Sequence, residues 1–286
     1  MSNKVHNDAK PDQTTTGHEW DGIKEYNTPL PRWWVWTFLA CIIWAFGYYF
    51  FMPSWPGING YLRGSLNWSA RKQLNEEMAA ARAANAGIIA KITASDLETI
   101  RKDPALLEFA MAGGKSAFGL YCAQCHGSGA QGAPGFPNLN DDDWLWGGTL
   151  EDIATTIRYG IRSGHDEARD NEMPAFIADE ILTPEQAATV ADYVVAIASG
   201  RKGSAEGAAI FEENCTACHG EGGVGDRSLG GPRLNDAIWL YGGTRKDVLA
   251  QLTRPRHGVM PAWVNKLDPA TIKELAVYVH SLGGGQ

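Results

Sequence analysis

The sequence contains few cysteines and has no pattern typical of a cleaved leader. Only 5 of its 286 residues are cysteine, and four of them fall in two short motifs, so none remain for a disulfide framework. The polar residues 1–32 also lack the short apolar core, followed by small residues, that marks a cleaved signal peptide. These absences exclude a small disulfide-stapled secreted protein. We therefore expect the export signal to be an uncleaved apolar helix.

Charge is also missing from one stretch, residues 33–52. At about 1.5 Å per residue, a helix of this length spans about 30 Å, the thickness of the hydrocarbon core of a bilayer. Aromatic residues gather at both ends of the stretch, as they do at the headgroup level of membranes, and Pro31 and Pro53 bracket it. We therefore predict a transmembrane helix within residues 33–55, in which Cys41 is a small lipid-facing or buried thiol. The alternative is a buried helix of a soluble protein.

One short motif occurs twice in the sequence. The string C-x-x-C-H is formed by Cys122, Cys125 and His126, and again by Cys215, Cys218 and His219. This string attaches haem c: the two thiols add to the vinyl groups of the porphyrin, and the histidine is the proximal ligand of the iron. A zinc ribbon places its cysteine pairs about 15 to 20 residues apart, and a thioredoxin-like pair does not need the adjacent histidine. The two motifs therefore predict two covalently bound haem c groups.

The surroundings of the two motifs also repeat. Each motif ends the longer pattern G-x-x-x-F-x-x-x-C-x-x-C-H, whose spacing puts Gly114 and Phe118, or Gly207 and Phe211, on one face of a helix. We expect each glycine to let the last helix of its own unit cross closely, near residues 190–198 and 275–282. Between these ends, Thr149 and Thr244 are candidate N-caps of a middle helix.

Composition divides the chain into five segments. We predict a cytoplasmic tail over residues 1–32, the transmembrane helix over 33–55, a periplasmic helical linker over 56–103, and cytochrome c domains over 104–200 and 201–286. Most of the tail is expected to be mobile, whereas residues 18–32, rich in aromatics and proline, are a candidate for contact with the membrane surface or a partner. Within the linker, Ser95 and Glu98 form a candidate capping box. The predicted fold class is all-α, with one N-terminal transmembrane helix followed by two tandem class I cytochrome c domains. Because haem c is attached outside the bacterial cytoplasm, we expect a single-pass protein of the inner membrane with its haem domains in the periplasm.

Each haem iron needs a second axial ligand, and the candidates repeat too. Met173 and Met260 each begin a Met-Pro-Ala-aromatic string. A residue before proline avoids the helical region, which places each methionine on an extended loop. His165 and His257 are rival ligands, and a haem with two histidines would have a lower potential.

These axial ligands predict electron transfer rather than catalysis, since a haem with both positions filled by protein has no site for a substrate. Gly127 and Gly220 are expected to leave room beside the porphyrin, and Arg158 and Arg254 either pair with haem propionates or are solvated. Residues 115–200 contain 4 basic and 13 acidic side chains, against 10 and 9 in residues 201–286. Such an acidic face would attract a basic cytochrome, with solubility as the alternative. No nucleic-acid partner is expected.

Nearly the whole chain resembles the membrane-anchored dihaem subunit of cbb3-type cytochrome c oxidases. The resemblance rests on the tail HEWDGIKEYNTPLPRWWVW, the MPSWPG after the transmembrane helix, and the two cytochrome c units. It implies a subunit that takes electrons from a soluble or membrane-bound cytochrome c and passes them to a monohaem subunit. From there they reach a haem-copper catalytic subunit, which reduces oxygen and pumps protons. By matching motif, the resemblance assigns Cys122, Cys125, His126 and Met173 to one haem, and Cys215, Cys218, His219 and Met260 to the other.

Two other functions share some of these features. A tethered dihaem carrier outside any oxidase has the same haem motifs, but it would purify without copper or haem b. A dihaem peroxidase needs one haem that opens a coordination site for peroxide, which the paired Met-Pro strings disfavour.

Overall fold

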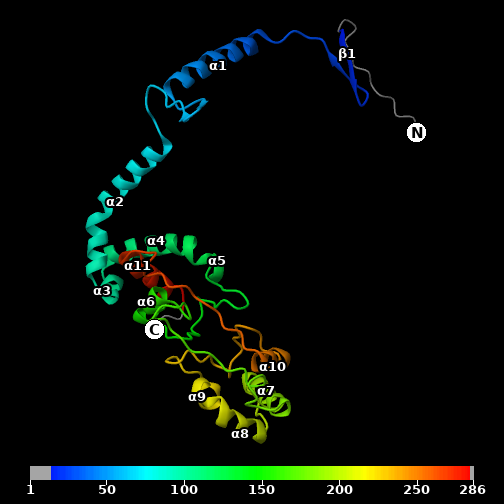
Figure 1. Cartoon of the computed structure of the whole chain (residues 1–286), viewed down its shortest axis with the longest axis vertical. Helices are drawn as coiled ribbons and strands as arrows, with labels where there is room; N and C mark the ends of the chain where they lie inside the picture. The colour runs from blue at the N-terminus through cyan, green and yellow to red at the C-terminus, as the bar shows by residue number, and fades with distance from the viewer. Residues whose placement is uncertain (1–13, 284–286) are drawn as a thin grey trace. The chain divides into compact units, whose positions relative to one another are not determined.

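The computed structural model describes residues 14–283, and the chain divides into two compact units that meet between Ala83 and Ala84. Regular structure in the described residues is helical apart from two short hairpins (Figure 1), as expected for an all-α protein. Both hairpins lie in the first unit.

The first unit begins with an antiparallel hairpin of β1 (Thr15–Trp20) and β2 (Ile23–Tyr26). Asp21 and Gly22 form its turn, and both have the positive φ that a tight hairpin turn requires. No hairpin was predicted for these residues. That most of the tail is mobile stays a prediction, and residues 1–13 lie outside the described part. An Asp-Gly pair between short polar and aromatic runs was the signal that sequence analysis missed.

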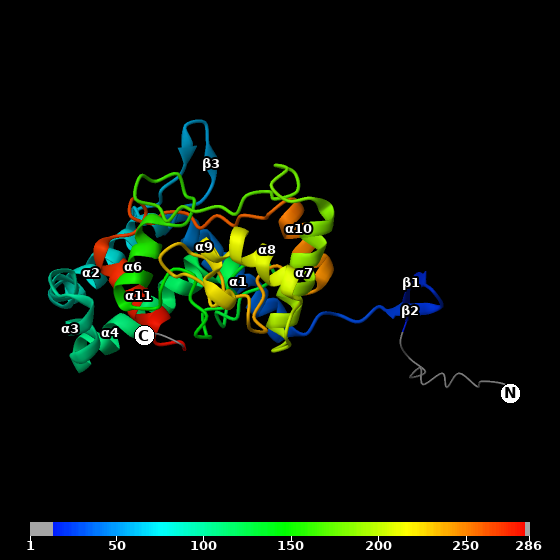
Figure 2. The same cartoon turned by 90° about the horizontal axis from the view of Figure 1, so that it is seen from below.

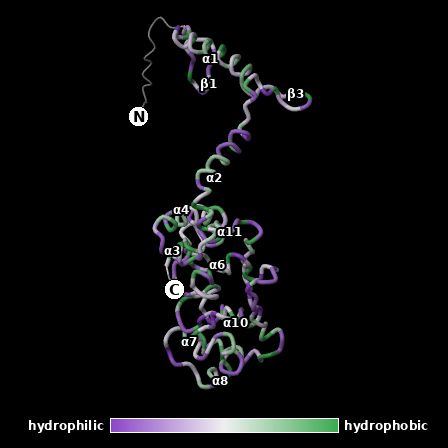
Figure 3. Tube along the Cα trace, turned by 90° about the vertical axis from the view of Figure 1, so that its left-hand side faces the viewer, coloured by the Kyte–Doolittle hydropathy of each residue, from purple (hydrophilic) through white to green (hydrophobic). Residues whose placement is uncertain are grey.

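Helix α1 (Arg32–Phe51) begins and ends within one residue of the charge-free stretch. Among the described residues it is the single helix long and apolar enough to cross a membrane, and none of its residues is buried. Its apolar segments are green in Figure 3. Trp34 stacks on Phe38 with ring centroids 5.3 Å apart, and Cys41 is exposed. An apolar helix exposed on all sides is what a bilayer accommodates.

A second hairpin, β3 (Pro56–Gly57) with β4 (Gly60–Tyr61), follows α1. The loop after it turns back onto the helix end, where the N–H groups of Ser65 and Leu66 donate to the carbonyls of Phe50 and Phe51. Helix α2 (Ala70–Ala94) then begins in the first unit and ends in the second. The linker is therefore helical over most of its length, as predicted.

The second unit continues with nine further α-helices and one 3-10 helix in its described residues. These are α3 (Leu97–Lys102), α4 (Pro104–Tyr121), α5 (Ala123–His126), α6 (Leu150–Tyr159), α7 (Pro184–Ala198), α8 (Ala205–Asn214), α9 (Thr216–His219), the 3-10 helix η1 (Glu221–Gly223), α10 (Arg245–Thr253) and α11 (Pro269–His280). Thr149 and Thr244 are the N-caps of α6 and α10, as predicted. The capping box predicted at Ser95 is wrong, because Asp96 caps α3.

The last helix of each repeat packs on the other repeat. Helix α11 lies on α4 and α6, whereas α7 packs on α8 and α10 (Figures 1 and 2). At the two crossings, Gly114 of α4 lies against Tyr278 of α11, and Gly207 of α8 lies against Tyr193 of α7. The glycine crossings were predicted correctly, but the expectation that each unit is closed by its own last helix is wrong.

Two hydrophobic cores result from this exchange. One is built from the end of α2 and from α3, α4, α6 and α11, the other from α7, α8 and α10. Residues 160–172 lead from the first core to the second, and residues 254–260 lead back. The second domain is therefore continuous in sequence and is inserted between α6 and α11 of the first. Packing thus cuts across the predicted boundary at residue 200.

Candidate haem sites

Each C-x-x-C-H motif occupies a short helix that follows a longer one. Helix α5 follows α4 at Cys122, and α9 follows α8 at Cys215. The N–H of the motif histidine donates to the carbonyl of the first cysteine at 3.0 Å in both copies. One helical turn therefore brings the two thiols and the imidazole of each motif to the same side.

A backbone carbonyl orients each motif histidine. His126 Nδ1 lies 3.0 Å from the carbonyl oxygen of Pro137, and His219 Nδ1 lies 2.9 Å from that of Pro232. A carbonyl only accepts, so Nδ1 carries the proton and Nε2 keeps its lone pair. Desolvation by burial lowers the pKa of both histidines, and the carbonyl bond opposes it in part. Both rings are therefore neutral and ready to bind iron through Nε2.

The cysteines of both motifs are unpaired thiols, and the first of each pair is half-buried. Burial, with a smaller effect of the second cysteine, raises the pKa of Cys122 and of Cys215 to about 11, so these thiols are protonated at neutral pH. All five cysteines are free of disulfides. The described residues contain no cluster of three or more His, Cys, Asp or Glu that would hold a metal ion on its own. The residues present therefore fit haem c.

A glycine follows each histidine directly. Gly127 has φ +81° and Gly220 has φ +71°, in the left-handed region that other residues avoid. Their expected role beside the porphyrin stays a prediction.

The structure pairs the two methionines with the motifs in the opposite way from sequence order. Met260 packs against the core that contains Cys122, and its backbone forms two hydrogen bonds of 3.0 Å with Ile161. Met173 packs against the core that contains Cys215. This packing differs from the pairing that the resemblance implies, Met173 with the first motif and Met260 with the second, and the iron ligation itself stays a prediction. Each exchanged helix brings the loop before it to the other motif.

The rival histidines differ in their surroundings. The ring of His165 packs on Tyr159, with centroids 4.9 Å apart, and its Nδ1 accepts from the backbone N–H of Glu167. His257 Nδ1 lies 3.8 Å from a carboxylate oxygen of Glu172, and its Nε2 is buried with no partner among the described residues. His257 is therefore the stronger rival of the two.

The two arginines expected near the haem propionates differ in their exposure. Arg254 is exposed and Arg158 is half-buried. Their pairing with haem propionates stays a prediction.

One hollow adjoins a motif histidine and lies between the two domains. It is lined by Asp143, Trp144, Val224, Gly225, Asp226, Arg227, Gly231, Pro232 and Arg233. Pro232 supplies the carbonyl that holds His219, and desolvation raises the pKa of Asp143 on the opposite side.

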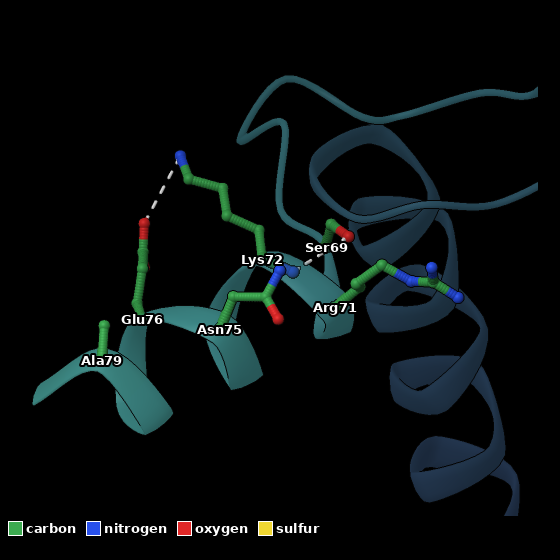
Figure 4. Close-up of a pocket in the computed structure, with 6 residues that line it drawn as sticks. All are labelled: Ser69, Arg71, Lys72, Asn75, Glu76 and Ala79. Carbon is green, nitrogen blue, oxygen red and sulfur yellow. Dashed lines mark hydrogen bonds and ion pairs between the residues drawn. The ribbon is translucent and has the colours of Figure 1, made fainter. Parts of the chain in front are cut away.

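Another hollow, in the first unit, is lined by Ser69, Arg71, Lys72, Asn75, Glu76 and Ala79 (Figure 4). It contains no cysteine, histidine or methionine, so it is not a haem site.

Comparison with known proteins decides the family. Residues 109–194 and 203–279 match the family described as cytochrome C oxidase, cbb3-type, subunit III, and residues 12–59 match the N-terminal domain of cytochrome oxidase-cbb3, FixP. The chain belongs to the cbb3-type oxidase subunit III family. This subunit III is 50% identical to the cbb3-type cytochrome c oxidase subunit FixP of Bradyrhizobium diazoefficiens and 50% identical to subunit CcoP of Cereibacter sphaeroides, over the full length of each. It is 52% identical to FixP of Azorhizobium caulinodans over 96% of this chain and 94% of that one.

Membership of the subunit III family confirms several predictions. The fold class, with two cytochrome c units in tandem, and the binding of haem c are as expected. So is the role of an electron-transfer subunit that is not itself the catalytic enzyme. The protein is anchored in a membrane and associates with other subunits of the oxidase.

Proposed function

We propose that this subunit III binds two haem c groups and relays single electrons between them. Cys122 and Cys125 would hold one group and Cys215 and Cys218 the other, with His126 and His219 as the proximal ligands. The observation that carries the proposal is the geometry of these histidines. Each is neutral, is fixed through Nδ1 by a backbone carbonyl, and has Nε2 free for iron.

Met260 is proposed as the distal ligand of the haem at His126, and Met173 as that of the haem at His219. The support is the packing of each methionine with the core that holds the corresponding motif. A haem c group with histidine and methionine ligands supplies a one-electron couple of fairly high potential. The chain contributes the fixed imidazole, the thioether and an apolar surrounding that keeps water away.

Electron transfer between the two sites is proposed to cross the contact of the loops that follow the motifs. The Gly135 N–H donates to the carbonyl of Leu240 at 2.8 Å, and a terminal nitrogen of Arg227 donates to the carbonyl of Asp142 at 3.5 Å. These bonds join the two domains beside the attachment sites. A firm contact of this kind keeps the distance between two redox centres constant.

The proposed partners and orientation follow from chemistry and charge. The donor is a soluble or membrane-bound cytochrome c, and the acceptors are the monohaem cytochrome c subunit and the haem-copper catalytic subunit of the oxidase. Attachment of haem c outside the cytoplasm favours haem domains in the periplasm, with α1 crossing the inner membrane once. The acidic surplus of residues 115–200 favours a basic donor, which it would attract at low salt.

Extraction in mild detergent tests the proposal. The material that travels with this chain should contain copper and haem b, and mass spectrometry of the polypeptide should show two bound haem groups. One haem per chain would contradict the proposal. So would carbon monoxide binding readily to both reduced haems, since both axial positions are proposed to be filled.

A further inference from the structure

Arg162 touches both of the loops that carry the methionines. Its Nε donates to the carbonyl oxygen of Gly258 at 2.8 Å, and one terminal nitrogen donates to the carbonyl oxygen of Asn171 at 2.8 Å. Gly258 precedes Met260 by two residues, and Asn171 precedes Met173 by two residues. One side chain thus bonds to both loops, in each case to the carbonyl two residues before the methionine.

The backbone fixes Arg162 in this place. The residue before it, Ile161, pairs with Met260, and the Arg162 N–H donates to the carbonyl of Arg169 at 2.8 Å. Arg162 has φ +50°, a conformation unfavourable for any residue but glycine. A strained residue with a half-buried charge persists where its surroundings hold it firmly.

The second repeat does not duplicate this arrangement. His257 follows Thr244 by thirteen residues, as Arg162 follows Thr149, so the two occupy equivalent positions. His257 faces a carboxylate of Glu172 at 3.8 Å instead of two carbonyls. The connection between the loops therefore depends on the planar guanidinium, which donates in two fixed directions at once.

We propose that Arg162 is a positioning residue that holds both methionine loops, so that the distal ligation of the two haems depends on one side chain. The inference rests on the proposed function, because it takes Met260 and Met173 as the distal ligands. The inference goes beyond that function because it predicts that the distal ligation of one haem cannot be weakened through Arg162 without weakening that of the other. Loss of the guanidinium should loosen both loops, although the side chain belongs to only one repeat.

The variant Arg162→Gly tests this in the full chain with its haems. Glycine accepts the positive φ, so the substitution removes the side chain without adding backbone strain. We expect both oxidised haems to lose part of their sulfur-to-iron charge-transfer absorption, both midpoint potentials to fall, and carbon monoxide to bind both reduced haems. The control Arg201→Gly removes the same charge from an exposed position and should leave all three measurements as in the wild type.

A second variant, Arg162→Lys, keeps the charge but not the planar fork. It should give intermediate changes in both haems, and it decides the question if Arg162→Gly is not recovered with haem. A change confined to one haem, or wild-type spectra and potentials in every recovered Arg162 variant, would overturn the proposal. A wild-type protein without the charge-transfer band would instead overturn the methionine ligands themselves, whatever the Arg162 variants show.

Discussion

Arg245 at the start of α10 and Asp192 of α7 form an ion pair, with Nε and Oδ1 2.6 Å apart. Asp192 belongs to the first repeat and Arg245 to the second, so the pair joins an exchanged helix to its new partner. At the equivalent positions of the other domain are Leu150 and Val277, both buried. If α7 took the place of α11, the carboxylate of Asp192 would be buried in this apolar environment. The free-energy cost of that burial is far larger than the stabilisation that the exposed ion pair contributes. We infer that this difference helps to sort the two last helices.

Val277→Asp should therefore be far more damaging than Asp192→Val. A carboxylate at a position that is 2% exposed lacks a charged partner and should lower the free energy of unfolding by about 3 kcal/mol or more. Asp192→Val removes only the exposed ion pair and should lower the free energy of unfolding by at most about 1 kcal/mol. Thermal unfolding of the purified variants measures both effects. Equal effects would show that the pair does not sort the helices.

Lys273 is predicted to stabilise the docking of α11 on the end of α2. Its Nζ donates to the carbonyls of Thr93 and Ser95 at 2.7 and 2.6 Å, groups that a helix C-terminus leaves without partners. Lys273→Met keeps the aliphatic stem and should lower the free energy of unfolding by about 1 to 2 kcal/mol. The exposed Lys246→Met is the matched control and should be neutral. A denaturation series in which Lys246→Met destabilises the protein more than Lys273→Met would contradict this prediction.

Glu274 should make stability depend on pH. Burial, with a smaller effect of Asp268, raises the pKa of Glu274 to about 7 from its usual 4.5. The folded state therefore holds the proton more tightly than the unfolded state. Stability is greatest below the unfolded pKa and falls as pH rises toward the folded pKa. Glu274→Gln should remove this dependence of stability on pH. At a pH of about 8 it should raise the free energy of unfolding by at most about 3 kcal/mol. Chemical denaturation at acidic and alkaline pH measures the free energy of unfolding. The same pH dependence in the wild type and the variant would refute the prediction.

The crossed pairing of methionines and motifs predicts which haem each substitution opens. In a chain that keeps only the first attachment site, through Cys215→Ser and Cys218→Ser, Met260→Ala should let carbon monoxide bind the reduced haem. Met173→Ala in the same background should not, because Met173 packs with the other core. Visible absorption spectra under carbon monoxide distinguish the two. The opposite result would restore the order expected from sequence.

Local chemistry made much of this protein predictable. Covalent haem attachment needs five consecutive residues, so His126 and His219 were evident without a fold. Partition into a bilayer depends on composition and length, so α1 was found within one residue. The hairpin at Asp21 and Gly22 was also open to prediction from its turn residues, but the signal was missed.

Which methionine packs with which motif is decided only by the tertiary structure. Both repeats carry the same glycine, phenylalanine and tyrosine at the helix crossing, so either last helix satisfies either partner. The contacts that discriminate are those of Lys273 with α2 and of Asp192 with Arg245. They join residues that are far apart in the chain. No local pattern reports such contacts, because their energy exists only once the two helices have been exchanged.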